Sequence, residues 1–123
     1  MSELLFTEDH EWVRQDDDGL VTIGITDHAQ DQLGDVVFVQ LPDVGARFGK
    51  GDEAVVIESV KAAGEIHLPA AGEIVEVNAT LADEPALVNQ DPLGDGWFLR
   101  VRLEDPAALG SLMDEAAYRA FLG

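Results

Sequence analysis

Apolar and β-branched residues recur in short runs separated by turn residues along most of the chain, a pattern typical of a mainly β protein. The first two runs are Glu11-Trp-Val-Arg14 and Leu20-Val-Thr-Ile-Gly-Ile25. Between them, Asp16-Asp-Asp-Gly19 contains the Asp-Gly pair that tight hairpin turns favour. The pattern therefore predicts an opening β-hairpin.

A short helix is predicted near residues 27–33, directly after this hairpin. Thr26 or Asp27 suits the N-cap, and Gly34 suits the left-handed position that ends a helix.

The next three strand-like runs surround one lysine. Asp35–Leu41 ends at a proline, Glu53–Val60 leads to Lys61, and Glu65–Leu68 returns from it. A fourth run, Glu73–Val77, alternates apolar and polar residues as a half-buried strand does. We predict that these runs form a β-meander centred on Lys61.

A short internal sequence repeat indicates how the strands are layered. Gly34-Asp-Val-Val-Phe-Val39 and Gly72-Glu-Ile-Val-Glu-Val77 match in pattern, 72 − 34 = 38 positions apart. Each copy leads through a turn-rich loop to a second strand, Glu53–Ile57 in one case and Trp97–Leu103 in the other. Two similar halves facing each other predict a two-sheet sandwich or flattened barrel.

The end of the chain is predicted to be helical. Residues 78–96 are interpreted as a polar loop. Asp105-Pro106 then places a capping carboxylate before proline, and a second helical piece is predicted from about Asp114 to Leu122. The side chains expected to pack on the sheet are Leu109, Leu112, Met113, Ala117 and Phe121. The 123 residues are thus interpreted as one domain, with a β core at about 20–103 and short C-terminal helices at about 105–122.

Composition narrows the classes of partner and chemistry. The formal net charge is -18, which opposes binding to nucleic acid and to anionic membranes. The chain has no cysteine, so it offers no disulfide, thiolate nucleophile or Cys-based zinc site. The N-terminus lacks a basic segment followed by an apolar one, so we expect a cytoplasmic bacterial or archaeal protein, or a mitochondrial matrix protein whose presequence has been removed.

No catalytic constellation is recognisable, and the chain is therefore predicted not to be an enzyme. His10, His28 and His67 fall on different predicted elements, so no metal site is expected. The three serines lie outside any Gly-x-Ser-x-Gly motif, and the glycines do not form a phosphate loop.

Lys61 is the residue that stands out. The chain has only one other lysine, Lys50, and Lys61 is followed by the small residues Ala62, Ala63 and Gly64. A lysine on a rigid turn with small neighbours is accessible to a modifying enzyme, and acylation would convert its charge into a flexible tether. The simpler alternative is an unmodified interaction module, in which an exposed turn lysine only blunts a strand edge.

The motif Glu58-Ser-Val-Lys61-Ala-Ala and the strands around it resemble the biotinyl/lipoyl carrier fold. Biotin carriers typically flank the lysine with methionines, where this chain has Val60 and Ala62. Nearly the whole chain is similar to the glycine cleavage H-protein family. The segments that carry this resemblance are His10–Val13, Val21–Val39, Glu58–Ala62, Gly72–Asn78, Gly96-Trp97 and Met113–Leu122.

The resemblance implies that Lys61 carries lipoate in amide linkage. It implies a shuttle that receives an aminomethyl group from glycine decarboxylase, delivers it to a tetrahydrofolate-dependent aminomethyltransferase, and presents the dithiol to dihydrolipoamide dehydrogenase for reoxidation. A lipoate-attaching enzyme is a further implied partner, and Glu58, Ser59, Val60 and Ala62 are the residues that it would recognise. A lipoate-relay protein of the same fold, which donates lipoate to other lipoyl domains, remains an alternative.

In this family the loaded arm can swing into a surface cleft. By matching positions, Glu11 and Glu65 are candidates to meet its amino group, with solvated surface carboxylates as the alternative interpretation. Asp9 and Gln32 occupy the other cleft-side positions.

Overall fold

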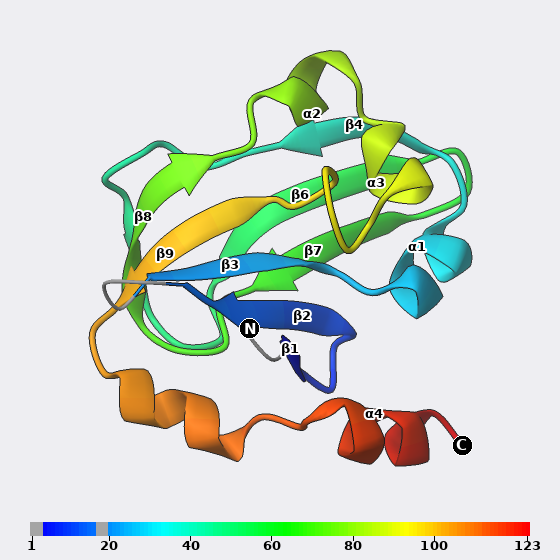
Figure 1. The fold of residues 1–123 in the computed structure, drawn as a ribbon. Coiled ribbons are helices and arrows are strands. Elements are labelled where there is room, and N and C mark those ends of the chain that lie inside the picture. The colour runs from blue at the N-terminus through cyan, green and yellow to red at the C-terminus, as the bar shows by residue number, and fades with distance from the viewer. Residues whose placement is uncertain (1–3, 17–19) are drawn as a thin grey trace.

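Two antiparallel sheets face each other in the computed structural model, which describes residues 4–16 and 20–123 (Figure 1). The strands are β1 (Leu4–Phe6), β2 (Glu11–Gln15), β3 (Leu20–Ile25), β4 (Val36–Gln40), β5 (Arg47–Phe48), β6 (Glu53–Ser59), β7 (Ala63–His67), β8 (Gly72–Val77) and β9 (Leu99–Leu103). The larger sheet has the order β1-β2-β3-β9-β8-β5, and the smaller has the order β4-β6-β7. The predicted mainly β, two-sheet architecture is confirmed.

Short helices flank the sheets: α1 (Asp27–Leu33), α2 (Thr80–Asp83), α3 (Leu87–Gln90), a 3₁₀ helix (Pro106–Ser111) and α4 (Glu115–Leu122). The predicted caps of α1 are confirmed, because the Thr26 side chain accepts from the Ala29 backbone N and Gly34 has a φ of 76°. The predicted starts of the two C-terminal helices are confirmed as well. Asp105 and Asp114 each accept a hydrogen bond from a backbone N–H in the first turn that follows.

The opening hairpin has the predicted register. β2 pairs with β3 from Glu11 opposite Ile25 to Gln15 opposite Val21. The Asp-Gly turn predicted to join these strands includes residues 17–19, which lie outside the described residues.

The internal sequence repeat is confirmed in the structure, because its two copies occupy equivalent places in the two sheets. β4 pairs with β6 in the smaller sheet, and β8 pairs with β9 in the larger one. The inner faces of both sheets meet in one core, with Ile57 and Ile66 from the smaller sheet and Ile23, Ile74 and Val101 from the larger one. Burying both apolar faces at once is what stabilises the sandwich.

The predicted continuous meander is wrong after β7. β6 and β7 form a hairpin, but β8 pairs with β5 and β9 in the other sheet. A single meander would leave the apolar face of β6 and β7 exposed to water. The chain instead crosses between the sheets through the buried Leu68 and Ala70, so that β8 and β9 cover that face.

The interpretation of residues 78–96 as a polar loop is also wrong. The segment contains α2 and α3, each of which buries one apolar side chain, Leu81 or Val88. The Asn78 amide fixes the segment by donating to the backbone carbonyls of Asp95 and Trp97, at 2.8 and 2.9 Å. One buried residue per four-residue helix is too weak a pattern to predict.

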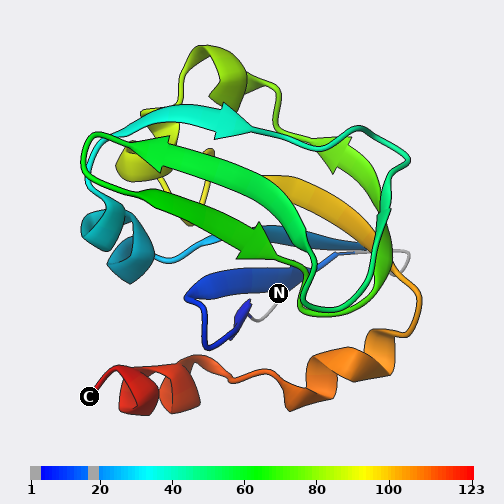
Figure 2. The same cartoon turned by 180° about the vertical axis from the view of Figure 1, so that it is seen from behind.

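The C-terminal helices lie below the larger sheet, beside β1 and β2 (Figures 1 and 2). Leu109 is buried and Leu112 and Met113 pack against the cores, as predicted. Ala117 and Phe121 were expected to pack inward but are exposed. Tyr118 is the buried residue of α4, and its ring stacks on Phe6 with centroids 4.6 Å apart. Since α4 runs along the edge strand, only one side chain reaches the core.

Candidate functional site

Lys61 lies at the tip of the β6–β7 hairpin. The Ser59 backbone N donates to the Ala62 carbonyl at 2.9 Å, and the Ala62 backbone N donates to Ser59 Oγ at 3.0 Å. The Val60 backbone N, also in this turn, donates to the carbonyl of Asp35, which lies outside it, at 3.0 Å. These bonds hold the tip in one conformation, while the Lys61 side chain is exposed.

The stem of Lys61 runs past the end of α1. A Cβ atom added to Gly34 would lie 3.0 Å from Lys61 Cε, and one added to Gly64 would lie 3.2 Å from Leu33 Cδ2. Both views place the hairpin turn beside α1 (Figures 1 and 2). Two glycines therefore allow the helix end and the hairpin to approach closely.

The residues predicted to be recognised by a lipoate-attaching enzyme lie together on this turn. Glu58 and Ala62 are exposed, Ser59 is half-buried, and Val60 is 66% exposed. The sequence interpretation missed Phe38, which pairs with Glu58 across the sheet and is 49% exposed. The bulge between Val36 and Phe38 disturbs the alternation of side chains there, so periodicity could not show which residue faces outward.

A cleft of about 350 Å³ lies next to the lysine-bearing turn. Three of the four predicted cleft residues line it, namely Asp9, Gln32 and Glu65. The remaining wall combines His10 and His28 with apolar or small residues, Ile25, Ala29, Leu33, Ile57 and Gly64. The cleft wall thus combines apolar side chains with polar and ionisable groups.

Glu11, the fourth predicted cleft residue, lines an adjacent cavity of about 300 Å³ instead. Asp9 lines both spaces, so the two lie on either side of it. Glu11 is only 1% exposed, which shows that its interpretation as a solvated surface carboxylate is wrong. Its Oε2 accepts from the His67 backbone N at 2.8 Å, and its Oε1 accepts from Thr7 Oγ1 at 3.3 Å.

Burial raises the pKa of Glu11 from its ordinary value of 4.5 to about 7. The hydrogen bonds from His67 and Thr7 lower that pKa, and the negative charge of Asp9 raises it further, but burial is the largest cause. At neutral pH the protonated and ionised forms of this carboxyl group are therefore both populated.

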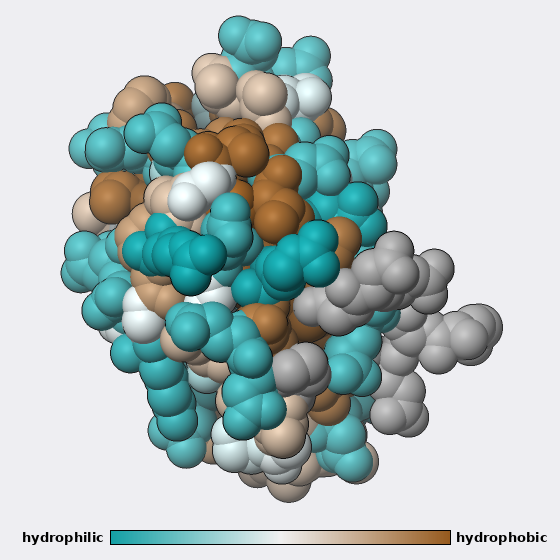
Figure 3. Space-filling view, turned by 90° about the vertical axis from the view of Figure 1, so that its left-hand side faces the viewer, coloured by the Kyte–Doolittle hydropathy of each residue, from teal (hydrophilic) through white to brown (hydrophobic). Residues whose placement is uncertain are grey.

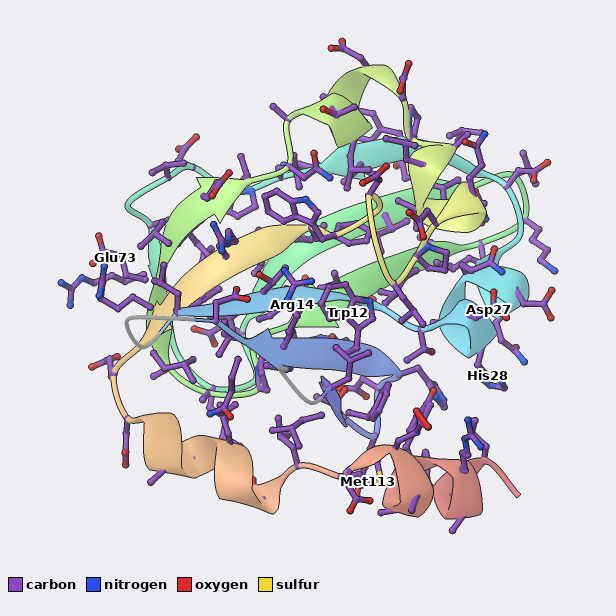
Figure 4. The ribbon with its side chains drawn as sticks, viewed as in Figure 1. Trp12, Arg14, Asp27, His28, Glu73 and Met113 are labelled. Atoms are coloured by element: carbon purple, nitrogen blue, oxygen red, sulfur yellow. The ribbon has the colours of Figure 1, made fainter. Side chains whose placement is uncertain are left out.

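The structure brings together histidines that the sequence placed on separate elements. The His10 and His28 rings have centroids 4.6 Å apart. Figure 4 shows His28 extending from α1 toward α4, and His10 Nδ1 lies 2.7 Å from the Tyr118 hydroxyl. Burial and the neighbouring His28 lower the pKa of His10, although Asp9 raises it. His67 lies elsewhere, beside Asp9 and Glu11.

The opposite end of the molecule is shown in Figure 3. Hydrophilic side chains cover much of that face, with apolar side chains gathered between them. Among the helices of residues 4–16 and 20–123, none is long and apolar enough to cross a membrane.

Comparisons with known proteins agree on one family. A family model described as glycine cleavage H-protein matches residues 4–123. The chain is 61% identical over 123 residues to the glycine cleavage system H protein of Rhodospirillum rubrum, covering 100% of this chain and 98% of that protein. It is 59% identical over 122 residues to glycine cleavage system H protein 1 of Pseudomonas aeruginosa, covering 99% and 95%.

A solved structure is similar throughout. The crystal structure of a glycine cleavage system H protein from Mycobacterium marinum superposes with a TM-score of 0.90 at 39% identity, covering 98% of this chain and 97% of that one. The full-length matches in sequence and fold, together with the lysine-bearing hairpin, show that the chain belongs to the glycine cleavage H-protein family, the lipoyl carriers of the glycine cleavage system.

Proposed function

We propose that lipoate is attached to Lys61 through an amide bond to Nζ, and that this chain works as a carrier without catalysing a reaction itself. The observation that carries the proposal is the position of Lys61. It is exposed at the tip of a hydrogen-bonded turn, and its stem passes Gly34 near the cleft lined by Leu33 and Gly64. Membership of a lipoyl-carrier family supports the same assignment.

The cleft suits the arm that such a lysine would bear. Ile25, Ala29, Leu33 and Ile57 offer apolar contacts to an aliphatic chain. Gly64, which has no side chain, lines the same cleft and packs closely against Leu33. When bound, lipoate supplies the disulfide and dithiol chemistry that a chain without cysteine lacks.

We assign the carboxylates of Glu11 and Glu65 to binding the amine of the carried one-carbon group. Glu65 is exposed on the cleft wall, and Glu11 lines the adjacent cavity, which shares Asp9 with the cleft. A cationic amine near Glu11 would favour its ionised form, because an opposite charge lowers the pKa of a carboxyl group. Asp9 and Gln32 add polar contacts along the same wall.

The proposed partners are glycine decarboxylase, the aminomethyltransferase, dihydrolipoamide dehydrogenase and a lipoate-attaching enzyme. We infer that the last of these reads Glu58, Ser59, Val60 and Ala62, which share one turn with Lys61. A net charge of -18 favours partners with basic docking surfaces. We also propose that residues 1–123 act as one carrier domain, and that it works in the bacterial cytoplasm, as the bacterial relatives suggest.

Intact mass measures the attachment directly. The chain is incubated with lipoate, ATP and a lipoate ligase, and we expect one lipoyl group on the natural sequence. Lys61→Ala should gain none, while Lys50→Ala, which removes the only other lysine, should gain one. A lipoyl group on Lys61→Ala, or an unmodified natural chain, would contradict the proposal.

Function is tested by glycine–CO₂ exchange with glycine decarboxylase. The lipoylated chain should support exchange and the unmodified chain should not. Failure of the lipoylated chain would revive the lipoate-relay alternative, which the family comparisons do not favour.

A further inference from the structure

Three potential metal-ligating side chains meet beside the 300 Å³ cavity. Asp9, Glu11 and His67 each offer one ligand atom, and these atoms all lie within 4.8 Å of one another. The distance from His67 Nδ1 to Asp9 Oδ2 is 3.9 Å. Two ligands bound tetrahedrally to Zn²⁺ at about 2.1 Å lie about 3.4 Å apart, so small side-chain rotations would bring these atoms into coordination.

His67 supplies an independent sign of a missing ligand. Its Nδ1 is buried and, within the part of the chain that the structure describes, has no hydrogen-bond partner. Buried polar atoms are nearly always paired, so an orphaned one calls for an explanation. A lone pair on Nδ1 facing two carboxylates gains nothing from their oxygens, which are acceptors when ionised, but it is a good ligand for a cation.

The surrounding contacts hold the Glu11 carboxylate and the Asp9 backbone in place. The Glu11 carboxylate is fixed by the His67 backbone N and by Thr7 Oγ1, and Thr7 Oγ1 also accepts from the Asp9 backbone N at 3.2 Å. On the other side of the imidazole, His67 Nε2 lies 3.9 Å from Glu53 Oε1. Metal-bound histidines commonly have a carboxylate on that side, where it orients the ring.

We propose that Asp9, Glu11 and His67 form a binding site for one divalent transition-metal ion, such as Zn²⁺, with the remaining coordination positions open to the cavity. Two carboxylates balance the ion's charge, and a single imidazole favours Zn²⁺ or a neighbouring first-row metal over Mg²⁺ and Ca²⁺, which prefer oxygen ligands alone. Because Glu11 is also the carboxylate that the proposed function assigns to an amine, a bound ion would compete with that amine.

The test is isothermal titration of the untagged, EDTA-treated and dialysed chain with Zn²⁺, near neutral pH. A background of 150 mM salt and excess Mg²⁺ suppresses nonspecific binding to an acidic surface. We expect one saturable site per chain, and we expect both His67→Asn and Asp9→Asn to weaken it by about tenfold or more. Unmodified protein is used throughout, so failure here does not touch the lipoylation proposal.

The matched control is His28→Asn, which removes a histidine from the neighbouring His10–His28 pair. This variant should bind Zn²⁺ as the natural chain does. Loss of binding in His28→Asn but not in His67→Asn would place the ion between His10 and His28 and overturn the proposal. Absence of a saturable site, or equal affinity in His67→Asn, would overturn it as well. Far-UV circular dichroism verifies that each variant is folded.

Discussion

Glu11 Oε2 accepts a 2.8 Å hydrogen bond from the backbone N of His67, so a carboxyl group on β2 in the larger sheet is bonded to β7 in the smaller one. The group is almost fully buried at this junction. Its charge is therefore poorly solvated, and the fold binds its proton more tightly than the unfolded chain does.

This relationship predicts a pH-dependent effect of Glu11→Gln. A raised folded-state pKa means that the Glu11 contribution to stability falls as pH rises from about 4.5 to about 7, and is constant above that. Glutamine is neutral at every pH and can still accept from the His67 N–H. The variant should therefore gain stability relative to the natural chain across this window, reaching about 3 kcal/mol.

Urea unfolding at several pH values, in EDTA to keep cations away, measures this difference. Glu65→Gln is the matched control, because Glu65 is exposed and should show no such trend. A stability difference for Glu11→Gln that is the same at pH 4 and pH 8 would contradict the prediction.

Gly34→Ala should destabilise the chain by about 1–3 kcal/mol. Gly34 has φ 76° and ψ -160°, a region that residues with a Cβ atom rarely adopt. The new Cβ would also meet Lys61 Cε, although the flexible lysine stem can move away. Lipoylation should persist while stability falls, as measured by intact mass and by urea unfolding.

The control for this variant is Gly110→Ala. Gly110 has no positive φ and has open space where a Cβ would lie. Its replacement should change stability by less than about 0.5 kcal/mol. Equal effects of the two substitutions would argue against strain at Gly34.

Gly24→Ala should destabilise the chain, because it disturbs the packing around Trp12. A Cβ at Gly24 would lie 2.6 Å from the indole carbons Cε2 and Cζ2 of Trp12. The indole is buried between neighbours and tethered by a 2.8 Å hydrogen bond from Nε1 to the Pro92 carbonyl, so it cannot shift freely. We expect a loss of about 2–3 kcal/mol and altered near-UV circular dichroism. An unchanged spectrum with full stability would refute this prediction.

Tyr118→Phe tests the polar contacts of the C-terminal helix. The hydroxyl lies 2.7 Å from His10 Nδ1 and 3.0 Å from Thr26 Oγ1, while the ring stacks on Phe6. Phenylalanine keeps the stacking but leaves both polar atoms with one partner fewer, so we expect a loss of about 1–2 kcal/mol in urea unfolding. Ala120→Ser, on the exposed side of α4, should cost about 0.5 kcal/mol or less.

Local signals predicted much of this fold, because they depend on neighbours in sequence. Thr26 and Gly34 bounded α1 correctly, and Asp105 and Asp114 marked the C-terminal starts. The crossing from β7 to β8 was not predictable in the same way. Whether β8 extends one sheet or covers the other depends on which apolar face remains open, and that is decided by strands distant in sequence.

The candidate site likewise contains features that neighbours in sequence predict and features that depend on residues distant in sequence. The prediction of Lys61 and its turn rests on a continuous motif, so it needs only neighbours in sequence. The burial of Glu11 depends on His67 and Thr7 folding over it, and the pairing of His10 with His28 depends on α1 approaching the β1–β2 turn. No spacing rule links residues 56 positions apart, as Glu11 and His67 are.

The backbone of Phe6 exchanges two hydrogen bonds with Met113, at 2.7 and 3.0 Å. β1 is the first strand of its sheet, and this short bridge occupies donor and acceptor groups that the strand would otherwise present to another molecule. The C-terminal segment therefore covers an edge through which copies of the chain could otherwise associate by strand pairing.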